Sequence, residues 1–314
     1  MAYETINVSF CVMTKDRVRE TLQCIRKLIE LSLDAPEHIY PEIVVLCNGT
    51  SQEILTQLKD GVIAEFLGVG SVSYKIIEST SNAGVAGGRN ALFKQSTGEI
   101  VVFIDDDAVI ETSSGLFWEK ITEFYFNSNM GILAFKSLAP NGTVTPKEIP
   151  VPLKESDKIT ETVSFVGVAH VIKRSIIQRD VLYPSKLFYG MEEWYLSLLV
   201  MNFGKKIIYD PQLVVKHYKS QVNRLEKDQY YVNLARNKVY ISFLAMPWFS
   251  KLSYYVLWSL WLLRRTHLSL KLLIKFNNEL WELWKSQDTT NFRMRLSSRC
   301  ILHILKLKPQ ALFF

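Results

Sequence analysis

Three adjacent carboxylates, Asp105, Asp106 and Asp107, follow directly after the short apolar run at residues 100–104. This run is rich in β-branched residues and predicts a buried strand. Side chains two positions apart on a strand share a face, so Asp105 and Asp107 can hold one hard cation, because Mg²⁺ and Mn²⁺ prefer oxygen ligands. A solvated acidic turn is the alternative.

A second acidic pair, Glu192 and Glu193, lies inside the aromatic and apolar segment at residues 187–196. Apolar surroundings raise the pKa of a carboxylate and suit it to general-base work. The alternative is a helix N-terminus, where the helix dipole favours two acids. His217 follows an expected strand at residues 213–216, and a lone histidine there is more often structural than a ligand.

The segment at residues 81–90 contains Gly84, Gly87 and Gly88 but does not match the dinucleotide fingerprint GxGxxG. Its glycines suit a close approach of backbone to a phosphate at a helix N-terminus, with Arg89 as the charge partner. A tight loop that packs a helix onto the sheet is the alternative.

Strand and helix patterns alternate along the first third of the chain and predict an α/β fold with a doubly wound, mainly parallel sheet. Strands are expected at residues 7–13, 41–46, 73–77 and 100–104, and helices at 18–31, 52–58 and up to 94. Ligands of such sheets bind beyond the C-terminal strand ends. The sequence after residue 107 predicts a helix at 116–126, a long loop at 139–160 and strands at 164–172, 207–210 and 213–216.

The composition is that of a folded chain with a sizeable core, since 48% of its 314 residues are hydrophobic and 22% are charged. Its four cysteines form no CxxC pair, which favours reduced, mostly structural thiols in the cytosol; they are Cys11, Cys24, Cys47 and Cys300. The first residues lack a basic region followed by a long apolar run, so no secretory signal is expected.

The net charge of +6 is concentrated in the tail, where residues 251–314 carry eleven Lys or Arg against three Asp or Glu. Residues 252–263 are uncharged but too few for a membrane span of about 20 residues. The Trp, Leu and Lys pattern that follows suits amphipathic helices on an anionic membrane surface. A helical bundle packed on the catalytic domain or on a second subunit is the alternative, and no nucleic-acid motif is present.

Taken in order, these segments resemble the inverting family 2 glycosyltransferases of the GT-A fold, especially bacterial rhamnosyltransferase-like and surface-polysaccharide enzymes. The resemblance rests on TKDR, CNGTS, SNAGVAGGRN, TGEIVVFIDDD, FYGMEEWYLSL, YDPQLVVKHYKS and YYVNLARNKVY, between residues 6 and 240. It implies a GT-A catalytic domain at residues 1–220, with a nucleotide-sugar-binding half at 1–107 and an acceptor half at 108–220. A C-terminal helical, membrane-associated region would follow at 221–314.

The resemblance also implies roles for individual residues. Asp107 would bind a divalent Mn²⁺ or Mg²⁺, with Asp105 sharing this site and His217 approaching it. Glu193 would be the catalytic base, with Glu192 as the alternative. Residues implied to bind the nucleotide sugar are Thr14, Lys15, Arg17, Asn48, Asn82, Gly84, Arg89, Asn90, Asp105 and Asp106. The recurrent pair Arg236 and Asn237 has no assigned role.

Two positions depart from the family pattern, because Cys47 stands where an acid usually precedes Asn48 and Glu193 stands where Asp is usual. The implied activity is metal-dependent, inverting transfer of a sugar from a nucleotide-diphosphate sugar to a hydroxyl of a glycan or lipid-linked acceptor. It would take place peripherally on the cytoplasmic face of the membrane, and the C-terminal helices are compatible with an oligomer. The alternatives are a sugar nucleotidyltransferase-like enzyme, for which TKDR is a thin match, and a non-catalytic, membrane-associated sugar-nucleotide-binding protein.

Overall fold

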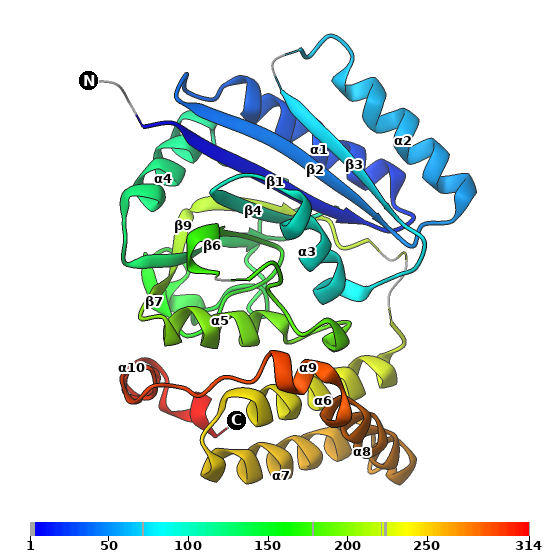
Figure 1. The fold of residues 1–314 in the computed structure, drawn as a ribbon, viewed down its shortest axis with the longest axis vertical. Helices are drawn as coiled ribbons and strands as arrows, with labels where there is room; N and C mark the ends of the chain where they lie inside the picture. The colour runs from blue at the N-terminus through cyan, green and yellow to red at the C-terminus, as the bar shows by residue number, and fades with distance from the viewer. Residues whose placement is uncertain (1–3, 71, 178, 221, 223–224, 314) are drawn as a thin grey trace.

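The fold was analysed in a computed structural model that describes residues 4–70, 72–177, 179–220, 222 and 225–313 (Figure 1). The strands are β1 (Ile6–Thr14), β2 (Ile39–Asn48), β3 (Ser73–Ser79), β4 (Ile100–Asp105), β5 (Ala108–Ile110), β6 (Met130–Leu138), β7 (Thr160–Thr162), β8 (Ala169–Lys173) and β9 (Lys206–His217). The helices are α1 (Val18–Leu33), α2 (Gln52–Phe66), α3 (Gly84–Gln95), α4 (Ser114–Phe126), α5 (Glu192–Asn202), α6 (Lys227–Ala245), α7 (Trp248–Arg265), α8 (Leu270–Lys285), α9 (Gln287–Asn291) and α10 (Ser298–Leu307). Short 3₁₀ turns are η1 (Leu153–Glu155), η2 (Arg174–Ile176), η3 (Ser185–Leu187) and η4 (Pro309–Leu312).

The strands form one sheet in the order β3-β2-β1-β4-β8-β6-β9-β5, and β7 pairs with β9. In the first half, β1 pairs in parallel with β2 and β4, and β2 with β3, while α1, α2 and α3 connect successive strands. This alternation confirms the predicted α/β fold with mainly parallel strands. Because β1, β2 and β4 run in the same direction, their C-terminal ends meet at one edge.

The second half of the sheet is mixed and differs from the sequence prediction in several places. Strands β5, β6 and β7 were not predicted, and the strand expected from residue 164 begins only at Ala169. The two strands expected at 207–210 and 213–216 are one strand, β9, which contains Pro211. The register between β6 and β9 shifts from Phe135 opposite Asp210 to Lys136 opposite Val214. Proline is tolerated there because a bulge needs no ladder hydrogen bond from that position.

Two hydrophobic clusters cover the two faces of the sheet. On one face, Val8, Phe10 and Val12 of β1 pack with buried residues of α1, α2 and α4. On the other face, Cys11 joins a cluster that includes residues of α3 and α5. The strand alternation of the sequence therefore places the helices on both faces, as a doubly wound sheet requires. All four cysteines are buried and free, in agreement with the structural role expected for them.

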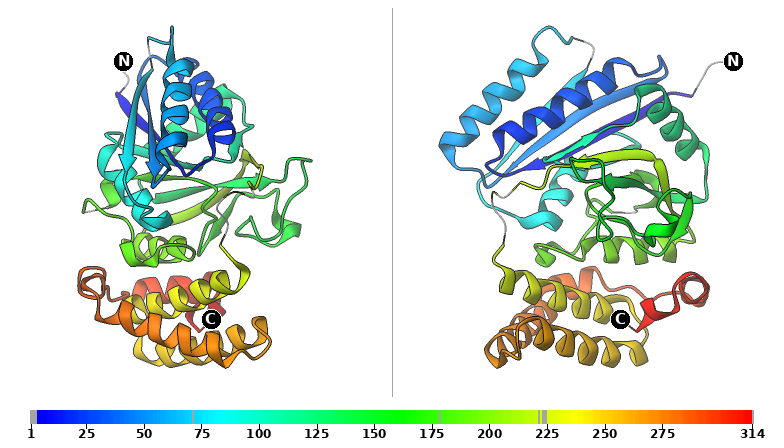
Figure 2. Two further views of the ribbon diagram at one scale, coloured as in Figure 1. Left: turned by 90° about the vertical axis from the view of Figure 1, so that its right-hand side faces the viewer. Right: turned by 180° about the vertical axis from the view of Figure 1, so that it is seen from behind.

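The C-terminal helices form a layer below α5, on the side away from β1–β3 (Figures 1 and 2). They share the cluster that includes α3 and α5, to which Tyr254, Trp258 and Leu262 of α7 contribute at four-residue spacing. The predicted helical extension is thus confirmed, and it packs on the α/β part of the chain. Within the described residues, no helix has the length and apolar character needed to cross a membrane.

The boundary predicted between residues 220 and 221 adjoins residues 221, 223 and 224, which lie outside the described part of the chain. The prediction about the extreme N-terminus likewise concerns residues 1–3, which are not described. The division into residues 1–220 and 221–314 therefore stays a prediction.

Candidate functional site

Polar turns gather where the parallel strands end. Thr14 closes β1, Asn48 closes β2 and Asp105 closes β4. The antiparallel pairing of β5 with β9 sets Ala108 opposite His217, which brings that histidine beside Asp107. The sheet thus brings together side chains more than a hundred residues apart in the sequence.

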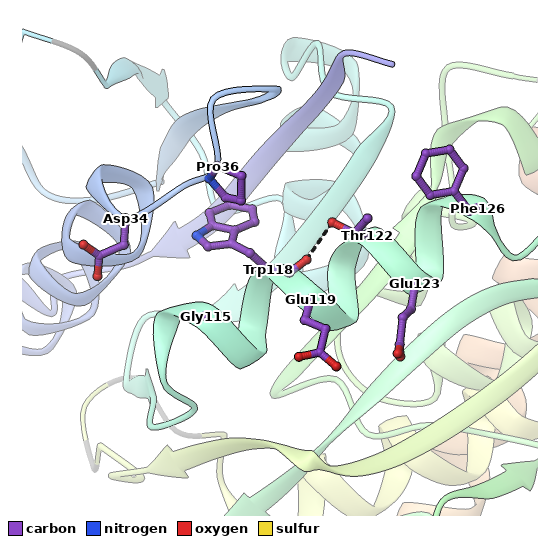
Figure 3. Close-up of a pocket in the computed structure, with 8 residues that line it drawn as sticks. All are labelled: Asp34, Pro36, Gly115, Trp118, Glu119, Thr122, Glu123 and Phe126. Atoms are coloured by element: carbon purple, nitrogen blue, oxygen red, sulfur yellow. Dashed lines mark hydrogen bonds between the residues drawn. The ribbon is translucent and has the colours of Figure 1, made fainter. Parts of the chain in front are cut away.

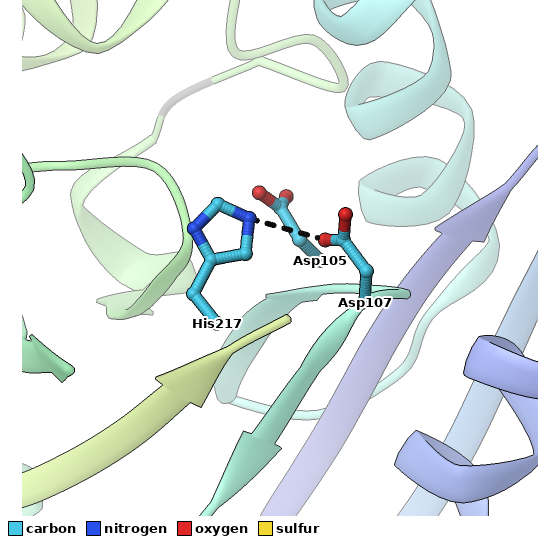
Figure 4. Close-up of side chains that lie close together, drawn as sticks. All are labelled: Asp105, Asp107 and His217. Carbon is cyan, nitrogen blue, oxygen red and sulfur yellow. Dashed lines mark ion pairs between the residues drawn. The ribbon is translucent and has the colours of Figure 1, made fainter. Parts of the chain in front are cut away.

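Asp105, Asp107 and His217 form a cluster in which one ligand atom from each residue lies within 4.8 Å of the others (Figure 4). The Nε2 atom of His217 lies 3.2 Å from Oδ1 of Asp107. Two carboxylates and one imidazole are a donor set that fits a divalent metal, and the carboxylates favour Mg²⁺ or Mn²⁺. The predicted metal ligands are therefore adjacent.

Arginines balance the charge of the three aspartates. Arg17 Nη1 lies 2.8 Å from Asp106 Oδ1 and 3.2 Å from Asp107 Oδ2, and Arg89 Nη2 lies 3.2 Å from Asp105 Oδ1. Burial raises the pKa of Asp105 to about 6 and that of Asp106 to about 7. The pKa of Asp107 is instead lowered, because hydrogen bonds from His217 and the Ser220 amide and the charge of Arg17 outweigh its burial. Asp107 is thus the aspartate most firmly held as an anion.

Glu148 supports His217 from the side away from Asp107. Its Oε2 atom lies 3.2 Å from His217 Nδ1, and its Oε1 atom lies 2.7 Å from Lys219 Nζ. Although burial opposes it, hydrogen bonds to Asp107 and Glu148 raise the pKa of His217 to about 10. A carboxylate on the second ring nitrogen fixes the orientation of a metal-binding histidine. Sequence reasoning missed Glu148, which lies in the long loop expected at residues 139–160.

The acidic pair opens α5, and both of its carboxylates approach Arg89. Arg89 Nη1 lies 3.3 Å from Glu192 Oε1 and 3.7 Å from Glu193 Oε1, while Nη2 donates to the Gly167 carbonyl at 2.8 Å. Burial and the neighbouring Glu193 raise the pKa of Glu192, whose Oε2 atom has no hydrogen-bond partner among the described residues. The Glu192 side chain is 4% exposed and that of Glu193 is 22% exposed, so Glu193 is the more accessible of the two.

Gly167 is required for the close approach of these groups. A Cβ atom at this position would lie 2.2 Å from Glu193 Oε1 and 2.8 Å from Arg89 Nη2. Any larger residue would therefore displace the glutamate or the arginine. Gly167 lies just before β8, and apart from its residue type no sequence pattern indicated this role.

The glycine-containing loop at residues 81–90 is held by Asn82 of the loop and by Asn48 at the end of β2. Asn48 Nδ2 donates to Asn82 Oδ1 and to the Gly84 carbonyl, both at 3.1 Å, and Asn48 Oδ1 accepts from the Ala83 amide at 3.0 Å. Gly84 has a φ of +70°, and a Cβ there would lie 2.3 Å from the Phe188 carbonyl oxygen. Asn48, Asn82 and Gly84 therefore shape the loop at the N-terminus of α3.

Two of the residues expected to bind the nucleotide sugar have structural partners. Thr14 is buried and accepts a hydrogen bond from Thr21 at 2.7 Å. Asn90 accepts from the Leu182 and Tyr183 amides at 2.8 and 2.9 Å, and it donates to the Tyr183 carbonyl at 2.8 Å. Lys15 lies partly buried in the turn after β1.

The pair Arg236 and Asn237 links α6 to the loop before α5. Asn237 Nδ2 donates to the carbonyls of Leu187, Tyr189 and Gly190 at 2.7, 3.0 and 2.7 Å. Arg236 Nη1 lies 2.8 Å from Glu279 Oε2 on α8. Phe188 and Met191 have positive φ angles of 56° and 69°, so this loop is held in a conformation that non-glycine residues rarely adopt.

A surface depression lies away from the strand ends, over α4 and the turn after α1 (Figure 3). Its volume is ≈ 490 Å³, and it is lined by residues such as Asp34, Trp118 and Glu123. The Trp118 indole packs inward and donates to the Leu31 carbonyl at 2.8 Å. None of the residues expected to do chemistry lines it, so we assign the site to the strand ends.

Comparison with known proteins agrees with this geometry. Residues 9–140 match the family model for glycosyl transferase family 2. An uncharacterised protein from Haemophilus influenzae is 27% identical over 172 residues, which is 53% of this chain and 85% of that protein.

Similar solved structures are glycosyltransferases. GalNAc-T7, solved with UDP, GalNAc and Mn²⁺, has a TM-score of 0.58 at 15% identity, covering 92% of this chain and 58% of that chain. A mannosyltransferase from Pyrobaculum calidifontis, in complex with GDP-Man and Mn²⁺, has a TM-score of 0.58 at 15% identity, covering 98% and 88%. S. aureus TarS 1–349 has a TM-score of 0.56 at 15% identity, covering 98% and 86%. Residues 9–140 thus match glycosyl transferase family 2, and the likeness to these solved structures shows that the chain has a GT-A fold.

Proposed function

We propose that this glycosyltransferase is metal-dependent and inverting, and that it moves a sugar from a nucleotide-diphosphate sugar to a hydroxyl of a glycan or lipid-linked acceptor. The observation that carries the proposal is the position of Arg89 between two acidic groups. One is the cluster of Asp105, Asp107 and His217, and the other is the pair Glu192 and Glu193. This arrangement places a metal-type site and a candidate base next to each other.

The residues present suit a single displacement. Asp105, Asp107 and His217 would hold a divalent ion, which would supply positive charge to balance the departing diphosphate. Glu193 takes the proton of the acceptor hydroxyl as its oxygen bonds to the anomeric carbon. The bond from that carbon to the diphosphate breaks, and the diphosphate leaves with the electron pair. Attack from the side opposite the leaving group inverts the anomeric configuration.

Release of nucleoside diphosphate from a panel of UDP-, dTDP- and GDP-sugars tests this function. We expect one donor to be turned over with Mn²⁺ or Mg²⁺ and not with excess EDTA. Glu193→Gln should lower turnover by roughly 10²–10⁴-fold while leaving nucleotide binding intact. Glu53→Gln, an exposed acid in the first turn of α2, is the matched control and should be unaffected. Turnover near the wild-type rate in Glu193→Gln would move the base to Glu192 or elsewhere.

The C-terminal helices support a second part of the proposal, which is peripheral association with the cytoplasmic face of a membrane. On α7, Trp248, Leu252, Val256 and Leu260 recur every four residues and are all exposed. On α8, the exposed apolar residues are Leu270, Ile274, Trp281 and Trp284. Exposed cations lie on the same helices, as expected of surfaces that rest on anionic lipid; they are Arg264, Arg265, Lys271, Lys275 and Lys285.

Flotation of the full chain with vesicles of phosphatidylcholine and phosphatidylglycerol tests this association. We expect the wild type to float and the triple variant Trp248→Ser/Leu252→Ser/Leu260→Ser to stay in the lower fractions. The control replaces Leu33, Tyr40 and Leu67 by Ser, since these residues are equally apolar and exposed on the N-terminal half. Wild-type protein that does not float, or equal loss in both triple variants, would reject the membrane surface.

A further inference from the structure

A small pocket adjoins the candidate base on the side of the C-terminal helices. Its volume is ≈ 180 Å³, and its lining includes Glu193, Trp194, Lys238, Lys308 and Ala311. These residues come from α5, α6 and the end of the chain, so the pocket forms only where the C-terminal layer meets the catalytic part.

The pocket carries two lysines without a carboxylate of their own. Among the described residues, neither Lys238 nor Lys308 forms an ion pair with a carboxylate within 4.0 Å, and Lys308 is exposed to water. Lys238 is partly buried, and its Nζ atom lies 4.0 Å from the centroid of the buried Trp194 ring. Burial, followed by repulsion from Lys308, lowers the pKa of Lys238 to about 7. Lys308 and the protonated form of Lys238 thus place positive charge beside the base, and an anion bound next to them would favour that protonated form.

We infer that this pocket binds a phosphoryl group of the acceptor through Lys238 and Lys308. The inference rests on the proposed function and adds the chemical class of the acceptor. A phosphoryl group carries about −1.5 to −2 charge at neutral pH, which balances two lysines, whereas a carboxylate balances one. Lysine binds phosphate as a point charge. Glu193 lines the same pocket, so an acceptor held here presents its neighbouring hydroxyl to the base.

An exposed aromatic surface next to the pocket favours a lipid as the source of this phosphoryl group. Phe313 lies two residues beyond Ala311, and its ring centroid is 6.4 Å from that of Phe249. The Phe249 ring in turn lies 6.1 Å from that of Trp248, which is 82% exposed. An acyl or polyprenyl chain attached to the phosphoryl group can cover these rings. This contact is favourable because it removes apolar surface from water.

Calorimetric titration of the full chain with n-octyl phosphate and with inorganic phosphate, both in EDTA, tests the inference without loading the metal site. We expect n-octyl phosphate to bind more tightly than inorganic phosphate. Lys308→Gln and Lys238→Met should each weaken its binding by at least about tenfold, because a hydrogen bond to a charged group is lost. Lys306→Gln, an exposed lysine on α10, is the matched control and should leave the affinity unchanged.

Unchanged affinity in Lys308→Gln would overturn the inference, and because Lys308 is exposed this variant should fold normally. An equal loss of n-octyl phosphate affinity in Lys306→Gln would also overturn the inference, because the phosphate would then be attracted by the general positive charge of the C-terminal helices. Equal affinities for the two phosphates would reject the lipid source. Failure of the proposed function is separate, because it would appear as absent metal-dependent nucleotide binding in the wild type.

Discussion

Replacing Arg89 by Met tests whether this buried arginine holds the two acidic groups together. Arg89 is 5% exposed, and Met keeps part of its apolar stem. The substitution removes the cation 3.3 Å from Glu192 Oε1 and the donor 2.8 Å from the Gly167 carbonyl. Glu192 then remains buried with neither of its oxygens paired to a cation.

The expected cost is about 3–5 kcal/mol of the free energy of unfolding, the range for breaking a buried ion pair by removing one partner. Asp105 and Glu193 add little to this figure because their side chains are 35% and 22% exposed. The matched control is Arg26→Met, which breaks a pair with Glu65 in which the arginine side chain is 58% exposed. An exposed pair of this kind contributes little to stability, so Arg26→Met should lose much less than Arg89→Met.

The cost should also depend on pH, because the charge of Arg89 opposes the rise in the pKa of Glu192. Without Arg89, the pKa of Glu192 rises further above the ordinary value of 4.5 for a glutamate. The folded state then binds a proton that the unfolded state has already lost, so stability falls as pH rises above about 4.5 towards the folded pKa. We therefore expect Arg89→Met to lose more stability at pH 8 than at pH 5.

Urea unfolding of the wild type, Arg89→Met and Arg89→Met/Glu192→Gln at both pH values measures these effects. The double variant has no buried carboxylate at position 192, so it should regain stability and lose the extra pH dependence. A single variant with the stability of Arg26→Met, or a double variant without recovery, would refute the role assigned to Arg89.

Three further variants test the supports of the site. Glu148→Gln should weaken Mn²⁺ binding by about 10–100-fold in a calorimetric titration, because His217 loses the carboxylate that orients it; unchanged affinity would contradict this role. Gly167→Ala should lower turnover and leave nucleotide affinity unchanged, since its Cβ displaces Glu193; wild-type turnover would show that the close approach is not needed. Asn237→Ala leaves three carbonyls of the loop before α5 without their donor, so we expect unfolding by urea to show a loss of about 1–3 kcal/mol. No loss there would mean that the loop holds its shape alone.

The position of the two aspartates was predictable because Asp105 and Asp107 alternate at the end of a clear apolar strand, and parallel strand ends meet at one edge. The strand pattern did not predict that His217 joins them, since a lone histidine after a strand is more often structural. Its approach to the site was implied only by the resemblance, and the pairing of β5 with β9 brings it there. The resemblance of the ordered motifs added the family and the GT-A fold.

Other features depend on contacts that no local pattern encodes. Glu148 reaches His217 across 69 positions of sequence from a loop without periodicity. Strand β6 does not alternate between apolar and polar residues, because residues 131–135 are all buried. A short buried strand of this kind has no distinctive period in the sequence. Asn90 accepts hydrogen bonds from the Leu182 and Tyr183 amides, which lie 92 and 93 positions away in the sequence, and its expected role in nucleotide-sugar binding stays a prediction, as does that of Thr14.

Calorimetric binding of UDP, dTDP and GDP, each with and without Mn²⁺, tests the central claim most directly. The titration compares the wild type with Asp107→Ala and with Asp60→Ala, an exposed acid on α2 that serves as the control. The account predicts that one nucleotide binds tightly, that this binding needs Mn²⁺, and that Asp107→Ala abolishes the metal dependence while Asp60→Ala does not. Nucleotide binding that is indifferent to both Mn²⁺ and Asp107 would contradict it.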